Sequence, residues 1–381
     1  MKGTRLIKCI LASILTTVML AGCGADDDSD RIRIGVIAPL TGGAAVFGES
    51  SSQGTILAFE EINESGGVLG RQLEWFVFDD MHNVVESVNA YNRLVHDNNV
   101  VAIVGPVTSG PTSAVGNANA ASNDRIPMIT PTATAEEVTT HGDFIFRACF
   151  LDAQQAYTMA YFARNHLGAT TAAILYDSAM DYSTGLAENF RATFEALGGS
   201  VIAYEAYITN DVDFRAQLTS IRALDPDVLF LPDYFNTIAL MAAQINELGI
   251  TATLLGGDGW EGVFTVLDDP NFLNGAFYSS HFAFDDPSPL VQDFIRNYTE
   301  AYGIPPNSFA ALGYDAAKIM AEAIEAAGST EREAIIEALR NIDFRGVTGD
   351  ITFDEGGNPI KAVIIIGIEN GEAGLYMRID P

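Results

Sequence analysis

The side chains that could perform acid–base, nucleophilic or metal chemistry are scattered along this chain of 381 residues. No histidine lies two to four residues from another, so the spacing of a histidine metal site is missing. The sequence contains no G-x-S-x-G nucleophile elbow, no G-x-x-x-x-G-K phosphate loop and no H-E-x-x-H zinc helix. We therefore expect no enzymatic activity, no metal and no cofactor. The five histidines are His82, His96, His141, His166 and His281.

One G-x-G-x-x-G pattern does occur, at Gly257 to Gly262 after an apolar run. The carboxylates of Asp258 and Glu261 would face a pyrophosphate, and Trp260 would block close approach of the backbone. We therefore reject nucleotide binding at this loop. Two acidic pairs, at 79–80 and 285–286, could each hold a hard cation, but solvated carboxylates are the commoner case in an acidic chain.

Charge excludes one class of partner. Lysine and arginine number 20 against 50 aspartates and glutamates, a formal net charge of −30. Such a surface repels phosphate backbones and anionic lipid, so nucleic-acid binding is not expected. Hydrophobic residues make up 48% of the chain and charged residues 18%, which is typical of a folded body.

The first residues have the pattern of an export signal. Lys2, Arg5 and Lys8 precede an apolar stretch, which ends in Leu-Ala-Gly before Cys23. This ending resembles the bacterial lipobox, in which cleavage leaves a lipid-carrying cysteine; the alternative is an ordinary secretory signal with an incidental cysteine. We predict a signal peptide over 1–22, a lipid anchor on Cys23 and an acidic tether over 23–30. The protein would be exported and held at the periplasmic or extracellular face of a membrane by lipid alone.

Further along, short β-branched runs alternate with helical patterns at spacings of roughly 25 to 35 residues, which is typical of repeated βα units and a mostly parallel sheet. Long helical patterns follow at 309–327 and 330–339, and β-structure returns at 350–353 and 362–368. Late strands after helices indicate that the chain crosses between two lobes more than once. The earlier predicted strands are 32–39, 73–78, 100–104, 127–129, 171–176, 201–207, 228–231 and 251–255.

Parallel sheets bind ligands at the carboxyl ends of their strands, so the loops after these strands are the candidate site. They are rich in hydroxyls, aromatic rings and glycine, and in one of them an isolated acid, Asp258, stands among small residues. Their aromatic residues could be ordinary core, but clustering after strands favours a pocket lining. The loops are 41–48, 107–110, 130–134, 177–182, 232–234 and 256–260.

The same segments resemble the periplasmic branched-chain amino-acid binding proteins over nearly all of residues 31 to 370. The resemblance implies an α/β fold of the type I periplasmic binding protein, with two doubly wound parallel-sheet lobes joined by three crossovers around a ligand cleft. We place the crossovers near 148–151, 279–282 and 346–350. Lobe 1 is expected at 31–149 and 281–348, and lobe 2 at 150–280 and 349–381. The motifs are IGVIAPLTG at 34–42, AFEEIN at 58–63, VGP at 104–106, PMITPTAT at 127–134, YD at 176–177 and FD at 353–354.

The resemblance also implies a binding site. From the first lobe, Ser109 and Thr134 match the positions that hold an amino-acid carboxylate, and Thr132 matches a backbone carbonyl facing the ammonium. Ser109 could equally be a plain helix N-cap, and both roles can hold together. From the second lobe, Tyr182 and Tyr234 match ligand-facing positions, and Asp258 matches the acid that pairs with the ammonium.

Three departures from the family pattern bear on the ligand. Phe47 stands where a branched-chain binder has tyrosine, and Asp258 is one methylene shorter than the usual glutamate. Trp260 beside the acid could favour an aromatic or a smaller side chain. Met81 and Thr108 occupy positions that form a disulfide in some relatives.

We therefore expect a monomeric, lipid-anchored solute-binding protein that captures a branched-chain, other aliphatic or aromatic amino acid. It would deliver this ligand to an ABC permease and ATPase complex. The same fold could instead bind amides, urea or aromatic carboxylates, or act as a sensory module.

Overall fold

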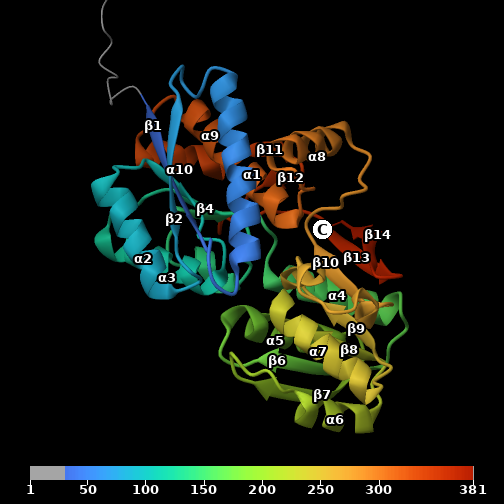
Figure 1. Ribbon diagram of the computed structural model, residues 1–381. Helices are drawn as coiled ribbons and strands as arrows, with labels where there is room; N and C mark the ends of the chain where they lie inside the picture. Colours follow the sequence, from blue (N-terminus) through green and yellow to red (C-terminus); the bar gives the residue numbers. More distant parts are fainter. Residues whose placement is uncertain (1–30, 381) are drawn as a thin grey trace, which may run out of the picture. The chain divides into compact units, whose positions relative to one another are not determined.

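The computed structural model describes residues 31–380, which form one compact unit (Figure 1). The predicted signal peptide, the tether and Cys23 lie outside the described residues. No helix among residues 31–380 is long and apolar enough to cross a membrane. Within the same residues, no cluster of three or more histidine, cysteine, aspartate or glutamate side chains could hold a metal ion.

The first sheet has five parallel strands in the order β2-β1-β3-β4-β5. Its central strands are buried almost completely, as expected for a sheet with helices on both faces. The strands are β1 (Ile32–Ala38), β2 (Leu73–Asp79), β3 (Ala102–Val104), β4 (Met128–Thr130) and β5 (Ile145–Arg147). The helices between them are α1 (Ala45–Glu64), α2 (Val84–Asn92) and α3 (Ser109–Ser122).

A late helix completes this lobe. Helix α9 (Ser308–Ala327) lies along α1, and α10 (Arg332–Arg340) packs on α9 (Figure 1). Glycines permit the close approach of α1 to α9. A Cβ at Gly54 would lie 1.9 Å from the Ala310 carbonyl oxygen, and a Cβ at Gly313 would lie 2.1 Å from the Ser51 carbonyl oxygen. Two segments more than 250 residues apart thus share one core.

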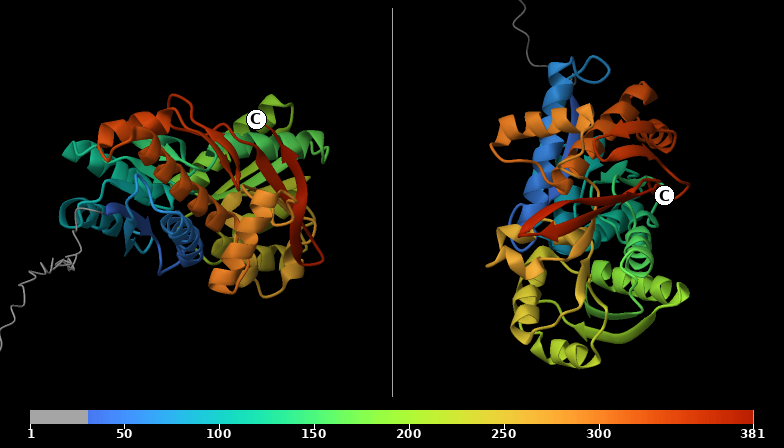
Figure 2. Two further views of the ribbon diagram at one scale, coloured as in Figure 1. Left: turned by 90° about the horizontal axis from the view of Figure 1, so that it is seen from above. Right: turned by 90° about the vertical axis from the view of Figure 1, so that its right-hand side faces the viewer.

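The second sheet has seven strands in the order β14-β13-β10-β9-β8-β6-β7. Strands β6 to β10 are parallel, whereas β13 pairs antiparallel with β10 and with β14, so the C-terminal hairpin, red in Figure 2, extends this sheet. The strands are β6 (Thr171–Asp177), β7 (Ser200–Tyr207), β8 (Val228–Leu231), β9 (Thr253–Gly256), β10 (Phe277–Ser280), β13 (Val363–Glu369) and β14 (Glu372–Ile379). Its helices are α4 (Asp152–Asn165), α5 (Asp181–Ala196), α6 (Arg215–Leu224) and α7 (Phe235–Leu248).

These two mainly parallel sheets with interleaved helices confirm the predicted fold class. The chain passes between the sheets after β5, through helix α8 (Pro289–Tyr302) after β10, and again before β13. Residues 346–350 lie in a separate two-stranded sheet of β11 (Asp343–Gly346) and β12 (Gly349–Thr352). The last passage therefore enters the seven-stranded sheet only at Val363.

The buried side chain of Lys361 makes hydrogen bonds to two of these passages. The Lys361 Nζ donates to the Ala148 carbonyl oxygen at 3.1 Å and to Thr348 Oγ1 at 2.7 Å. Thr348 Oγ1 in turn donates to Asp315 Oδ2 on α9 at 2.6 Å. Burial lowers the pKa of Lys361 to about 8, and the charge of Asp315 opposes this shift.

Candidate ligand-binding site

Asp258 follows β9, in a single helical turn over Asp258–Trp260, and its side chain is 2% exposed. Its Oδ1 accepts hydrogen bonds from the Tyr182 hydroxyl at 2.9 Å and from Gln155 Nε2 at 3.1 Å. Its Oδ2 lies 3.0 Å from His281 Nε2. Burial lowers the pKa of His281 to about 4, so the ring is neutral at pH 7. All three partners of Asp258 are neutral groups, and a buried carboxylate held only by neutral donors attracts a cation.

Gln155 connects this acid to a second one. Its Nε2 donates to Asp152 Oδ1 at 2.9 Å as well as to Asp258, and its Oε1 accepts from Ser279 Oγ at 2.7 Å and from the Asp258 N–H at 3.2 Å. All four hydrogen-bonding positions of the amide are therefore used, which fixes its orientation. Burial, with the charge of Asp258, raises the pKa of Asp152 well above its usual range.

Tyr182 holds the Asp258 loop against the lobe. Its hydroxyl donates to Asp258 and accepts from the Gly259 N–H at 2.9 Å. A Cβ at Gly257 would lie 2.6 Å from this hydroxyl oxygen, and a Cβ at Gly259 would lie 2.8 Å from it. The glycines of the G-x-G-x-x-G pattern thus make room for a tyrosine of their own lobe.

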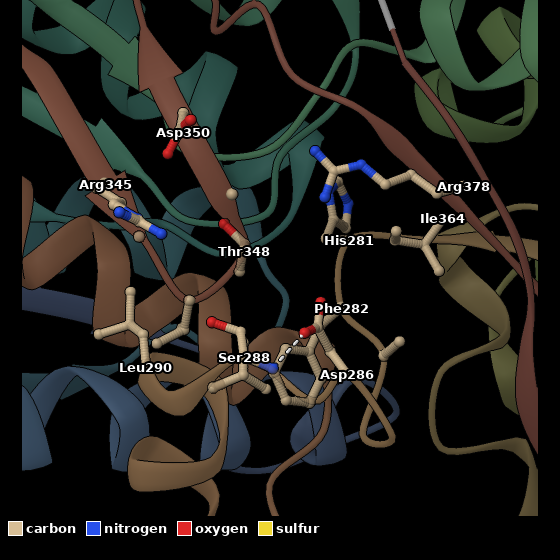
Figure 3. A pocket seen from close by; sticks show the side chains of 15 residues that line it. His281, Phe282, Asp286, Ser288, Leu290, Arg345, Thr348, Asp350, Ile364 and Arg378 are labelled. Atoms are coloured by element: carbon tan, nitrogen blue, oxygen red, sulfur yellow. Dashed lines mark hydrogen bonds between the residues drawn. The ribbon is translucent and has the colours of Figure 1, made fainter.

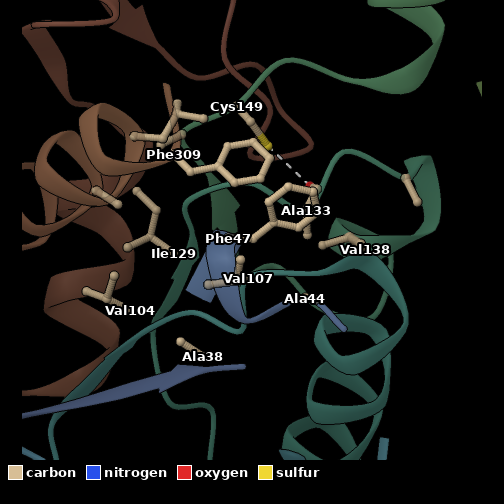
Figure 4. Close-up of a cluster of buried hydrophobic side chains, with 14 of the residues drawn as sticks. Ala38, Ala44, Phe47, Val104, Val107, Ile129, Ala133, Val138, Cys149 and Phe309 are labelled. Atoms are coloured by element: carbon tan, nitrogen blue, oxygen red, sulfur yellow. Dashed lines mark hydrogen bonds between the residues drawn. The ribbon is translucent and has the colours of Figure 1, made fainter. Parts of the chain in front are cut away.

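Aromatic rings connect the two lobes beside this acid. Phe47 of α1 contacts Tyr234, which precedes α7, with ring centroids 5.1 Å apart. Tyr234 also packs against Tyr182 at 5.1 Å and His82 at 5.8 Å. Behind Phe47 lies Phe309, at 4.5 Å, within the buried cluster of Figure 4.

The three first-lobe residues singled out by sequence are also buried. Ser109 is the first residue of α3, whose N-cap is Thr108, and its Oγ accepts from the Ala135 N–H at 3.3 Å. Thr132 Oγ1 donates to the Val107 carbonyl oxygen at 2.5 Å.

Thr134 lies where the two lobes meet. Its carbonyl oxygen accepts from the Asp152 N–H of α4 at 3.0 Å. Its hydroxyl also hydrogen-bonds to the Asp152 carboxyl group, and this contact opposes the larger effect of burial on the pKa of Asp152. Thr134 therefore contacts the first turn of α4 through both its backbone and its side chain.

Further polar contacts join the lobes at the edge of this region. Asn236 Nδ2 donates to the Gly43 carbonyl oxygen at 2.8 Å, and Asn189 Nδ2 donates to Glu136 Oε1 at 3.1 Å. The Ser308 hydroxyl at the start of α9 donates to Glu261 Oε2 at 2.7 Å. These contacts connect the two lobes around the site.

Trp260 has contacts with the body of the second lobe. Its side chain is fully buried, Nε1 donates to the Leu231 carbonyl oxygen at 2.9 Å, and the ring stacks on Tyr278 with centroids 6.0 Å apart. A Cβ at Gly256 would lie 2.0 Å from the indole. The indole thus supports the Asp258 loop from the core side.

Sequence reasoning missed Gln155 and His281. His281 directly follows β10, so the rule that selected the other loops could have found it. Gln155 lies in the first turn of α4, and no local pattern distinguishes it from Gln154 beside it.

The chain matches the family described as periplasmic binding protein over residues 31–373 and belongs to it. Within this class its relatives are branched-chain amino-acid binding proteins. The Leu/Ile/Val-binding protein BraC3 of Rhizobium johnstonii is 31% identical over 355 residues, which are 92% of this chain and 94% of the relative.

Two solved structures agree with this relationship. The leucine-binding protein LivK of Thermotoga maritima is 34% identical, with a TM-score of 0.86, and the match covers 92% of this chain and 99% of that one. The branched-chain amino-acid transporter substrate-binding protein LivJ of Streptococcus pneumoniae, in complex with isoleucine, is 29% identical, with a TM-score of 0.85. That match covers 92% of this chain and 100% of the other.

Proposed function

We propose that this chain is the solute-binding protein of an ABC importer and that it captures an amino acid between its lobes. The buried carboxylate of Asp258, surrounded by neutral donors, is the observation that carries this proposal. The relatives, among them a Leu/Ile/Val-binding protein, a leucine-binding protein and a complex with isoleucine, support a branched-chain or other aliphatic ligand. The protein acts by capture and release and performs no reaction.

Each end of an amino acid has a complementary group in this site. The ammonium pairs with Asp258 and with the Thr132 carbonyl oxygen. The carboxylate takes hydrogen bonds from Ser109 and Thr134, at the N-terminus of α3, where backbone N–H groups favour an anion. The rings of Phe47, Tyr182 and Tyr234 form the apolar wall.

A ligand without an amine would leave Asp258 unpaired inside a closed cleft, which is costly. This cost favours an amino acid over amides, urea and aromatic carboxylates as the ligand. Sensory use of the same captured amino acid would need the same contacts.

Titration calorimetry of Asp258→Asn tests the proposal, with L-leucine and its deaminated analogue 4-methylpentanoate as probes. The amide keeps the shape and removes the charge, so leucine should lose roughly 2 to 5 kcal/mol of binding free energy. The exposed Asp343→Asn is the matched control and should bind leucine as the wild type does. Equal leucine affinity in Asp258→Asn and wild type, or tighter binding of 4-methylpentanoate by the wild type, would contradict the proposal.

We also propose that Cys23 carries a lipid that holds the protein at the membrane. The acidic segment after it would give no attraction to anionic lipid on its own. Cys23→Ser, expressed in a bacterial host, should therefore appear in the soluble fraction, and continued membrane association would refute the anchor.

A further inference from the structure

The His281 ring makes two different contacts, one with a carboxylate and one with an aromatic ring. Its side chain is fully buried, and Nε2 lies 3.0 Å from Asp258 Oδ2. The ring also stacks on Phe150, with centroids 3.6 Å apart and an interplanar angle of 24°. A hydrogen bond in the ring plane and a stack on its face together leave the imidazole little freedom.

The neutral ring has a defined tautomer. Burial and the nearby charge of Lys361 lower the pKa of His281, while Asp258 acts in the opposite sense. A neutral imidazole carries one N–H, and an ionised carboxylate can only accept, so the proton is on Nε2. Nδ1 is buried without a hydrogen-bond partner among the described residues, which agrees with this assignment.

The donors on Asp258 are unevenly distributed. Oδ1 already accepts two hydrogen bonds, from Tyr182 and Gln155, whereas Oδ2 accepts one, from His281. A carboxylate oxygen offers about two lone-pair positions. The free position is therefore on Oδ2, beside the His281 N–H.

We propose that His281 is a positioning residue for the ligand site, which orients Asp258 so that Oδ2 receives the ligand's ammonium. This inference rests on the proposed amino-acid function. A neutral donor is suited to this role, because it directs the carboxylate without cancelling the charge that the ammonium needs.

His281 also lies in one of the passages of the chain between the two sheets. It follows β10 at the point where the chain leaves the seven-stranded sheet for α8. Together with Phe282 it borders a cavity of about 310 Å³, which Arg345 of β11 and Arg378 of β14 line from other sides (Figure 3). The segment that directs Asp258 is thus also one of the three passages between the sheets.

Two substitutions of His281 separate positioning from packing. His281→Phe keeps a stacking ring without a donor, and His281→Gln keeps a neutral donor. In calorimetry with L-leucine, His281→Phe should weaken binding by about tenfold or more, the loss expected for a hydrogen bond to a charged group. His281→Gln should keep most of the wild-type affinity for leucine. Binding of 4-methylpentanoate, which has no amine, should change little. His96→Phe, at an exposed histidine, is the control and should leave both affinities unchanged.

The decisive measurement is whether the effects of His281 and Asp258 substitutions on leucine affinity depend on each other. In an Asp258→Asn background, His281→Phe should cause no further loss of leucine affinity, because the charge to be directed is gone. Nitrogen NMR of the ligand-free protein should show His281, identified by its absence in His281→Phe, as the neutral Nε2–H form at pH 7.

Other outcomes would overturn the inference. Equal losses for leucine and 4-methylpentanoate would make His281 a structural residue, and a charged ring or an Nδ1–H tautomer at pH 7 would contradict the geometry. Leucine binding that depends on Asp258 but not on His281 would refute this inference alone. Failure of the wild type to bind any amino acid would refute the proposed function and this inference with it.

Discussion

The ring of Phe47 meets the ring of Tyr234 edge to face, with an interplanar angle of 90°, and so connects the lobe of the five-stranded sheet to the lobe of the seven-stranded sheet. Phe47→Leu should weaken L-leucine binding by about 0.5 to 1.5 kcal/mol, the range for one aromatic pair. Phe59→Leu is the control, because Phe59 is equally buried on α1 but faces Trp75 within its own lobe. Calorimetry checks both variants, and equal leucine affinity in Phe47→Leu and wild type would show that this contact does not support closure.

Ser109 offers its hydroxyl at the first turn of α3. Ser109→Ala should weaken carboxylate ligands by about 1 to 3 kcal/mol, as for the loss of a hydrogen bond to a charged group. L-leucinamide, which lacks the carboxylate charge, should lose less. Ser113→Ala, one turn further along the same helix, serves as the control in the same titration. Should leucine and leucinamide respond alike, Ser109 would have a packing role only.

The hydrogen bond from Ser308 to Glu261 joins the start of α9 to the loop that carries Asp258. We expect Glu261→Ala to weaken the contact between the lobes and to raise the rate of leucine dissociation by about three- to tenfold, as for the loss of an ordinary hydrogen bond. Stopped-flow release measurements on Glu261→Ala, Ser308→Ala and the double variant complete a mutant cycle. Additive effects in this cycle would mean that the two residues do not act through this bond.

Asp233 makes stability depend on pH. Burial raises its pKa from 3.8 to about 8, and its carboxyl group accepts from the Tyr234 N–H at 2.5 Å and from the Tyr207 hydroxyl. The folded state therefore holds a proton that the unfolded chain releases above pH 4. This contribution to stability is full at low pH and is lost as pH rises towards 8.

Asp233→Asn removes that titration. Below pH 4 the stabilities of wild type and variant should respond to pH in nearly the same way. Between pH 5 and pH 8 the wild type should lose about 3 to 4 kcal/mol of stability relative to the variant. Thermal unfolding of both proteins across this range measures the difference, and the shared acidic surface cancels in the comparison. Parallel curves for the two proteins would rule out a protonated Asp233.

The sequence by itself determined the alternation of strands and helices, the fold class and the loops at the carboxyl ends of the strands. These features depend on local periodicity and on apolar runs that a short segment carries. The isolated acid Asp258 was visible for a similar local reason, because it is the acid of the 256–260 loop and stands between two glycines.

Only the tertiary structure decided which side chains meet this acid. Gln155 and Asp258 are 103 residues apart, and Asp258 and His281 belong to loops after different strands. Similarly, the Trp260 indole donates a hydrogen bond to Leu231 in the core of its own lobe. Strand β12 pairs with β11 and not with the seven-stranded sheet. Such contacts follow from how strands order within a sheet and how lobes pack, which are non-local choices that no segment of sequence specifies alone.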